Sequence, residues 1–321
     1  MLRRQDVGHR VVVRRIVGVS HDRPLFTDAL GELVDLTETE LTLATAQGML
    51  RVPLREVHRA KRVPAARRPP AADVVALELA ANDAWPAPVQ ARLGGWILRA
   101  AGNWTGRANS ALAVGDPDRT LDAAIDAVVD WYGEHGQPAL INAPMPLAAP
   151  VNSALDARGW TARPLTLVQT APLAALLGGA DEPRDLPPVE LADAPTDDWF
   201  AMVAEHKGEL PAVAKQVLTA VPETVFGQVH DAAGGLVAVA RGTVTGPLRW
   251  HGISLLQTTP EQRRRGLAGH VLRAMAQWAA QRGATRAYLQ VEERNAAAIA
   301  LYRRLGFSTH HTYLTRAAPP A

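Results

Sequence analysis

The sequence contains no cysteine in 321 residues. Disulfide bonds, thiolate metal sites and a cysteine nucleophile are therefore excluded, and we expect no bound metal. Lysine is nearly absent as well, because the basic residues are overwhelmingly arginine and only Lys61, Lys207 and Lys215 occur. Such usage is typical of a GC-rich genome and does not by itself indicate a binding strategy.

Long hydrophobic runs are also missing. No window of eighteen apolar residues occurs, and the N-terminus lacks the charged-then-apolar pattern of a secretory signal. We therefore expect no membrane association and a cytoplasmic protein. The formal net charge of +2 does not support a nucleic-acid role for the whole chain, although the pI is about 9.2.

Two breaks rich in proline and glycine, at residues 62–70 and 177–188, divide the chain. They predict domains at 1–63, 72–176 and 185–321, each of ordinary domain size. Short alternating strands in the first predict an all-β, SH3-like barrel, which is mildly basic. The third predicts the order hairpin, strand, helix, strand, helix, strand. The expected fold class is therefore α/β with a mixed sheet, preceded by the small barrel.

The strand-to-helix junction of the third domain has the composition of an anion site. Arg263, Arg264 and Arg265 precede Gly266, and Ala268 lies in the first turn of the expected helix. That turn leaves backbone N–H groups free, and the helix dipole adds positive charge. The small residues would let a pyrophosphate approach the backbone closely. Taken alone, the segment could equally be a solvated basic loop.

A second segment follows about thirty residues later and makes the assignment specific. It has the pattern N-x-x-A-x-x-L-Y-x-x-L-G-F, formed by Asn295, Ala298, Leu301, Tyr302, Leu305, Gly306 and Phe307. Together with the R-x-x-G-x-A pattern of residues 263–268, it resembles the GNAT superfamily of N-acetyltransferases across roughly residues 185–315. The likeness is nearest to an actinobacterial type with an SH3-like segment and tandem GNAT-like halves.

The resemblance implies a function and a cosubstrate. Acetyl would pass directly from acetyl-CoA to a primary amine in a ternary complex, a reaction that needs no cysteine. The strand ending at residues 256–258 would pair with the pantetheine arm and present an N–H to the oxyanion. The implied acetyl-CoA contacts are Leu256, Gln257, Thr258, Arg263, Arg264, Arg265, Gly266, Leu267, Ala268, Asn295 and Tyr302.

The proton donor and the proton acceptor have separate candidates. By the resemblance, Tyr302 would protonate the leaving thiolate, which is chemically reasonable for a phenol; the alternative is an aromatic residue that only packs the last helix. In several relatives a glutamate helps to deprotonate the amine, but its position here is Gly252. His251 and Glu205 are the remaining candidates for the base, and a chain of waters is the alternative.

The middle domain resembles a degenerate copy of the last domain. At an offset of 147 residues, Trp131 aligns with Trp278, and the expected helices and strand follow in the same order. The cofactor motif is not repeated, since Asp116 and Asp118 occupy the positions of two arginines and Leu155 occupies that of the tyrosine. Carboxylates would repel a pyrophosphate. We therefore expect a single acetyl-CoA site.

Residues 94–110 of the middle domain form a polar stretch that could bind the acetyl acceptor between the two halves. Trp104, Arg107 and Asn109 are the expected contacts, and the alternative is that the tryptophans are core residues. The partner would be a small-molecule or peptide amine whose identity stays open, as does the oligomeric state. A non-catalytic acetyl-CoA sensor and a nucleic-acid-associated regulator are other possible classes. The second is disfavoured because Phe26 is the only aromatic residue in positions 1–62.

Calorimetric titration with acetyl-CoA should show one binding site per chain. Replacing Gly266 with a bulky residue should abolish that binding, because the side chain would block the approach of the pyrophosphate to the backbone. Two sites per chain would contradict the interpretation of Asp116 and Asp118.

Overall fold

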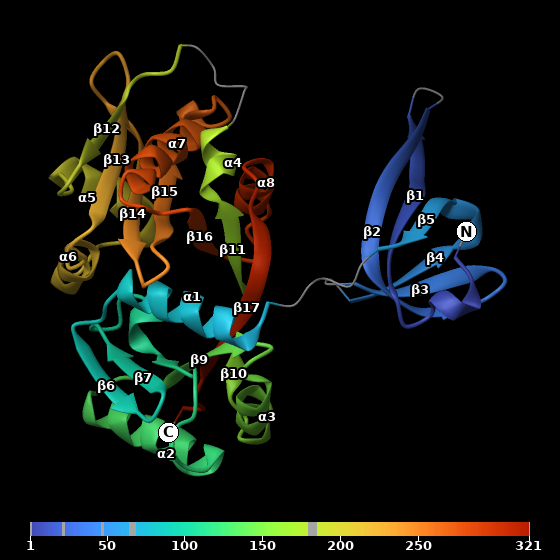
Figure 1. Cartoon of the computed structure of the whole chain (residues 1–321), viewed down its shortest axis with the longest axis horizontal. Coiled ribbons are helices and arrows are strands. Elements are labelled where there is room, and N and C mark those ends of the chain that lie inside the picture. The colour runs from blue at the N-terminus through green and yellow to red at the C-terminus, as the bar shows by residue number, and fades with distance from the viewer. Residues whose placement is uncertain (1, 21–22, 46–47, 64–68, 179–184, 321) are drawn as a thin grey trace. The chain divides into compact units, whose positions relative to one another are not determined.

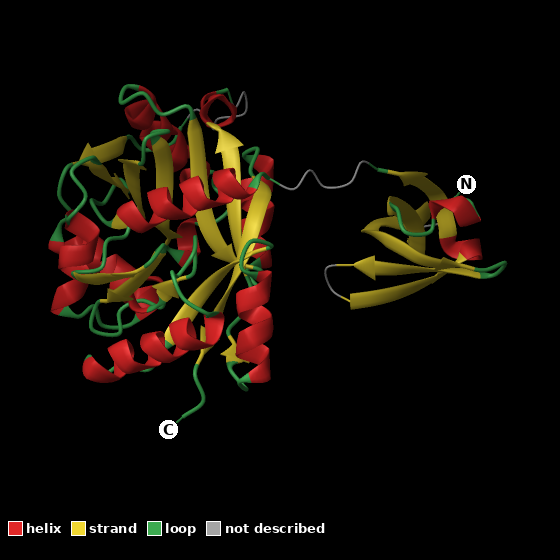
Figure 2. Cartoon of the chain, turned by 60° about the horizontal axis from the view of Figure 1, so that its bottom comes forward, coloured by secondary structure: helices red, strands yellow, loops and turns green. Residues whose placement is uncertain are grey.

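The computed structural model describes residues 2–20, 23–45, 48–63, 69–178 and 185–320. The chain forms two compact units, Met1–Arg68 and Pro69–Ala321. Figure 2 shows that strands predominate in the first unit, whereas the second contains both helices and strands. Among the described residues, no helix is both long enough and apolar enough to cross a membrane.

The first unit is a five-stranded antiparallel sheet in the order β4-β3-β2-β1-β5. Its alternating strands bury Val11, Val13, Leu33 and Leu43 completely, so the predicted all-β unit is present. The closed SH3-like barrel is not confirmed, because β4 and β5 are the sheet edges and no ladder joins them in the described segments. The strands are β1 (Arg10–Ser20), β2 (Arg23–Leu36), β3 (Glu40–Thr45), β4 (Gly48–Pro53) and β5 (Val57–Arg62).

The second unit is built on one twelve-stranded sheet in the order β12-β13-β14-β15-β16-β11-β17-β9-β8-β7-β6, with β10 paired to β17. The elements of residues 69–178 are α1 (Ala71–Asp83), β6 (Val89–Leu93), β7 (Trp96–Ala100), β8 (Ala111–Leu112), α2 (Leu121–Glu134), β9 (Leu140–Met145), α3 (Ala149–Ala157), β10 (Thr161–Ala162), β11 (Thr166–Pro172) and α4 (Leu173–Leu177). Those of residues 185–320 are β12 (Val189–Ala192), α5 (Asp197–Lys207), α6 (Ala212–Thr219), β13 (Thr224–His230), β14 (Leu236–Thr245), β15 (Trp250–Thr258), α7 (Leu267–Ala280), β16 (Arg286–Glu292), α8 (Ala296–Arg304) and β17 (Ser308–Ala317).

The two halves of this unit exchange strands. β11 comes from the middle half but lies between β16 and β17 of the C-terminal half. Reciprocally, β17 lies between β11 and β9. The expected ranges 72–176 and 185–321 therefore share a continuous sheet, and each half depends on the other for a hydrogen-bonded neighbour.

The architecture of the two halves is repeated, as the sequence offset predicts. Helix α3 (149–157) corresponds to α8 (296–304) at an offset of 147 residues. Each half also contains one parallel pair of strands with a helix between them in the sequence. These pairs are β8 with β9 and β15 with β16, and the other ladders are antiparallel. In α7 an apolar stripe is buried against the sheet, with Val271, Leu272 and Met275 fully covered.

Helix α1 packs where the two halves meet, as Figure 1 shows. Its Leu77 is completely buried in a cluster with Val168 of β11, Trp250 of β15, Tyr288 of β16 and Tyr313 of β17. The cluster combines the exchanged strands with both strands of the parallel pair. Packing in this cluster therefore couples the folding of the two halves.

Replacing Leu77 with alanine should lower the free energy of unfolding of the second unit by about 2–5 kcal/mol, because it opens a cavity in this shared cluster. All eight tryptophans lie between positions 85 and 278, so tryptophan fluorescence in a denaturant titration reports this unit alone. Leu248→Ala is the control and should change stability by less than about 0.5 kcal/mol, since Leu248 is 60% exposed. Separate transitions for the two halves would contradict the coupling.

Candidate active site

The strands β15 and β16 diverge partway along their length. Their parallel ladder joins His251 to Ala287, Gly252 to Tyr288 and Ile253 to Leu289, and it goes no further although both strands continue. Just beyond, Leu255 has φ +54° and the register of β15 against β14 shifts. We call residues 254–258 the splay segment. It presents a partly exposed strand edge with no ladder partner on the β16 side.

Helix α7 begins after the splay segment with a free N-terminus. Its N-cap is Gly266, whose φ of +93° favours glycine and which supplies no capping side chain. The first-turn N–H groups of Leu267, Ala268 and Gly269 have no intrahelical acceptor. The preceding arginines 263–265 are exposed. Free amides, the helix dipole and surrounding guanidinium groups together form a site suited to a phosphate anion.

Helix α8 places Tyr302 against the same core as Leu256 of the splay segment and Leu267 of α7. The ring of Tyr302 packs against Phe307 at 5.9 Å between centroids, and burial raises its pKa to about 12. Asn295 is the N-cap of α8, where its side chain accepts a hydrogen bond from the N–H of Ala298 at 3.1 Å. The structure thus brings Tyr302 near the elements of the expected cofactor site, while the Asn295 carbonyl oxygen is engaged in the cap.

The proposed base His251 is placed where it cannot meet an amine from solvent. It is completely buried, its Nδ1 lies 3.2 Å from the carbonyl oxygen of Thr243, and its ring is 6.4 Å from that of Trp278. Trp278 is eleven residues beyond Leu267, about 16 Å along α7 from the free amides. Burial lowers the pKa of His251 to about 4. The geometry gives no support to a catalytic role for this residue.

The position of the relatives' glutamate is closed to a side chain. A Cβ on Gly252 would lie 2.6 Å from the hydroxyl oxygen of Tyr288 and 2.8 Å from that of Thr243. Glycine is therefore required there by packing. The other candidate, Glu205, is exposed on α5.

The predicted acceptor residues lie where the middle half packs on α5, α6 and β14. Trp104 is buried and stacks on Trp85, with 5.5 Å between the ring centroids. It is therefore a core residue. Asn109 is a structural residue: its carbonyl oxygen accepts hydrogen bonds from the N–H groups of Ala101 and Asn103, and its amide donates to the carbonyl of Thr105. Arg107 is half-buried, with its guanidinium 5.2 Å from the Trp85 ring centroid.

The corresponding helix start in the middle half differs from that of α7. Helix α2 is capped by Thr120, whose hydroxyl accepts a hydrogen bond from the N–H of Ala123. Asp116 lies in the preceding turn and accepts from the N–H of Asp118. A capped end beside carboxylates is a poor anion site. That this half does not bind acetyl-CoA stays a prediction.

Several buried charges escaped prediction from sequence. Arg99 and Arg241 are 2% and 1% exposed, and Glu78 is paired with His311 at 2.7 Å in the interior. Burial lowers the pKa of Arg99 to about 10 and that of Arg241 to about 9. Arg241 directly follows the apolar run 236–240 of β14. A charged residue in a buried strand is the one sequence signal that could have drawn attention to it.

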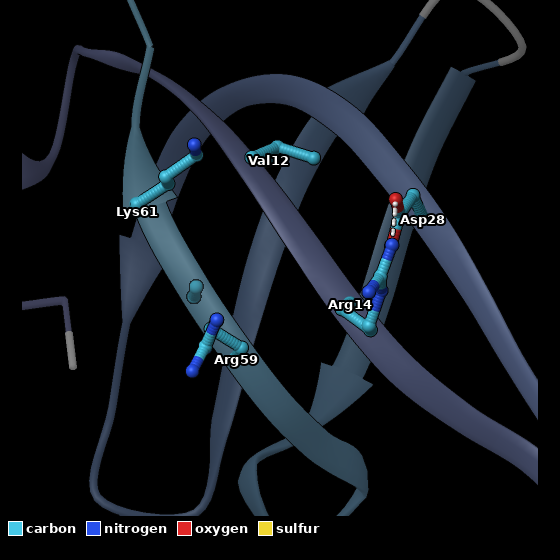
Figure 3. A pocket seen from close by; sticks show the side chains of 6 residues that line it. Val12, Arg14, Asp28, Arg59 and Lys61 are labelled. Carbon is cyan, nitrogen blue, oxygen red and sulfur yellow. Dashed lines mark hydrogen bonds and ion pairs between the residues drawn. The ribbon is translucent and has the colours of Figure 1, made fainter.

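The first unit carries a pocket of about 230 Å³ lined by Val12, Arg14, Asp28, Arg59, Ala60 and Lys61. Figure 3 shows Arg14 paired with Asp28, and Arg59 and Lys61 on β5, the strand beside that of Arg14. Asp28 accepts a hydrogen bond from Arg14 at 2.8 Å, and this bond lowers the pKa of Asp28. The pocket contains none of the motif residues.

Comparisons with known proteins agree on the class of the second unit. A GCN5-related N-acetyltransferase from Kribbella flavida superposes with a TM-score of 0.60 at 17% identity, covering 80% of this chain and 98% of that one. A tandem GNAT protein from the clavulanic acid biosynthesis pathway superposes with a TM-score of 0.52 at 17% identity, covering 78% and 94%. These likenesses show the fold, and the unit is a tandem GNAT fold.

The family follows from the sequence comparisons. Residues 71–315 match the family model described as "Probable histone acetyltransferase Rv0428c C-terminal". The chain is 32% identical over 323 residues to "Probable histone acetyltransferase Rv0428c" of Mycobacterium tuberculosis, covering 95% of this chain and 93% of that protein. It is 26% identical over 254 residues to "Uncharacterized N-acetyltransferase YobR" of Bacillus subtilis, covering 76% and 99%. The chain belongs to this family, and it is an N-acetyltransferase of the GNAT superfamily.

Replacing His251 with glutamine should flatten the acid limb of the stability profile. The pKa of His251 is about 4 in the folded protein against an ordinary 6.5, so the stability that it confers is present above pH 6.5 and is lost as the pH falls through about 4. Wild type should lose roughly 3 kcal/mol more than the variant over this range. Denaturant titrations of both proteins at each pH measure this loss of unfolding free energy. Parallel profiles would contradict the buried, neutral state of His251.

Proposed function

We propose that the chain transfers acetyl from acetyl-CoA directly to a primary amine in a ternary complex, at one site between α7, α8 and the splay segment. The observation that carries the proposal is the coincidence of an uncapped helix N-terminus with the divergence of β15 and β16. The first-turn N–H groups of α7 have no intrahelical acceptor, and the splay segment has no ladder with β16. A phosphate joined to an amide-bearing arm would complement both features.

The residues present fit acetyl-CoA. The N–H groups at the start of α7 would hold the pyrophosphate, helped by Arg263, Arg264 and Arg265. The edge of the splay segment, Leu256–Thr258, would pair with the amides of the pantetheine arm. A polar atom supports this placement: the side-chain oxygen of Gln257 is buried, and no hydrogen-bond donor reaches it within the described residues. When bound, acetyl-CoA supplies an activated acetyl group as a thioester.

Different groups would donate the proton to the leaving sulfur and accept the proton from the attacking amine. A backbone N–H of the splay segment would stabilise the carbonyl oxygen as the amine nitrogen forms its bond to carbon. Tyr302 would donate its phenolic proton to the sulfur as the carbon–sulfur bond breaks. Its pKa of about 12 keeps the donor protonated at neutral pH. Since His251 and Gly252 offer no base at the surface, the ammonium proton would leave through Glu205 or solvent water.

The acceptor would be a small-molecule or peptide amine reaching the splay segment from the side of Trp104 and Arg107. The mycobacterial relative is named a probable histone acetyltransferase, which adds a histone to the possible acceptors. The absence of cysteine in the chain supports direct attack, since no thiol can carry acetyl as an enzyme intermediate.

Replacing Tyr302 with phenylalanine should lower kcat by about a hundredfold, in the range expected for loss of general acid catalysis. The dissociation constant for acetyl-CoA, measured by calorimetry, should stay within about twofold, because the ring is retained. In wild type, kcat should not fall with rising pH up to about pH 10 through ionisation of this phenol, since its pKa is about 12. An unchanged kcat in the variant would remove Tyr302 from the reaction.

A further inference from the structure

Arg241 is a buried cation whose hydrogen bonds are incomplete. It is 1% exposed on β14, and it donates from Nε to the carbonyl of Leu218 at 2.8 Å and from Nη1 to the carbonyl of Ala84 at 3.0 Å. Its Nη2 is also buried, and no described residue accepts a hydrogen bond from it. A missing hydrogen bond of a buried charge is costly, so an acceptor from a bound ligand would stabilise this nitrogen.

Arg99 shows how the same fold satisfies a structural arginine. It is 2% exposed, and it donates from Nε to the carbonyl of Ser110, from Nη1 to the side chain of Asn82 and from Nη2 to the hydroxyl of Ser110. Every nitrogen of this guanidinium has a partner. The buried Arg316 also has a nitrogen, Nε, without a described partner, but its charge is paired with Asp156. Arg241 differs from both in combining an unpartnered Nη2 with no described carboxylate partner.

A second cation increases the positive charge around Arg241. The guanidinium groups of Arg107 and Arg241 lie 5.2 and 5.4 Å from the ring centroid of Trp85. Among the described residues, no carboxylate is within ion-pair distance of either one. The repulsion from Arg107 adds to burial in lowering the pKa of Arg241. Two uncompensated guanidinium groups on one aromatic ring are electrostatically complementary to an anion.

Arg241 is placed directly beside the proposed site of transfer. It is paired across the ladder with Ser254, the first residue of β15 beyond its ladder with β16. Residues paired in this way direct their side chains to one face of the sheet. The hydroxyl of Ser254 is likewise buried, with no described hydrogen-bond partner. The neighbouring Ala240 belongs to the core beneath α7, so Arg241 and the pyrophosphate site at α7 are on opposite faces.

We propose that Arg241 and Arg107 bind the negatively charged group of the acetyl acceptor, so that the substrate is an amine that also carries a carboxylate or a phosphate. The inference rests on the proposed function and deepens it. The anion would be fixed on the side of the sheet opposite α7, and the amine would extend from it toward the thioester at the splay segment.

Matched pairs of acceptors test the proposal. We would measure kcat/KM for 5-aminopentanoate against 5-aminopentanamide and for O-phosphoethanolamine against ethanolamine, with acetyl-CoA as donor. Wild type should prefer the anionic member of at least one pair about tenfold or more, and which pair is preferred distinguishes carboxylate from phosphate. Arg107→Gln should reduce that preference to about twofold. Arg92→Gln, at an exposed arginine of β6, is the matched control and should retain it.

The outcomes separate this inference from the proposed function. Equal rates for both members of each pair, or an unchanged preference in Arg107→Gln, would overturn the anion site while leaving acetyl transfer intact. If no amine were acetylated although acetyl-CoA bound, the proposed function would fail. Calorimetry with 5-acetamidopentanoate and its amide would then still test the anion site, with tighter binding of the acid supporting it and equal binding refuting it.

Discussion

The exchange of β11 and β17 is the constraint on which the second unit depends. Each strand fills a place in the other half's ladder, so neither half can satisfy its backbone hydrogen bonds alone. The exchange fixes the position of β16 against β11, and β15 can then diverge from β16 without leaving the sheet, because β14 holds its other edge. The strand edge at the splay segment can stay open because β14 holds β15 and β11 holds β16.

The two halves have kept one architecture but differ at the equivalent helix starts. Gly266 leaves the amides of α7 open, whereas Thr120 closes those of α2 with a side-chain cap. A single hydroxyl in place of a glycine, with carboxylates nearby, changes the site from attractive to unattractive for an anion. The middle half contributes instead through packing: Trp85, Trp104 and Arg107 cover the face of β14 opposite α7.

The buried arginines Arg99 and Arg241 differ in how completely their hydrogen bonds are made. Arg99 has three bonded nitrogens and behaves as part of the scaffold, while Arg241 has one nitrogen with no described partner beside the splay segment. Proteins rarely bury a cation without compensation. Such a residue next to the proposed site of acetyl transfer is more informative about the acceptor than the exposed arginines of the α7 loop, which we propose bind the cosubstrate.

The local pattern of the sequence determined what depends on neighbours along the chain: the apolar stripe of α7, the glycine that begins this helix at 266, the junction suited to an anion and the repeat at an offset of 147 residues. It also marked Tyr302 and the lack of a glutamate at Gly252. Tertiary structure alone decided the strand exchange, the burial of His251 beneath α7, the use of Asn109 to hold a loop, and the meeting of Arg241 with Arg107 across Trp85. The strand exchange and the meeting of Arg241 with Arg107 join residues more than one hundred positions apart. The roles of His251 and Asn109 depend on individual side-chain contacts at shorter range. Periodicity and spacing carry no signal for either kind of contact.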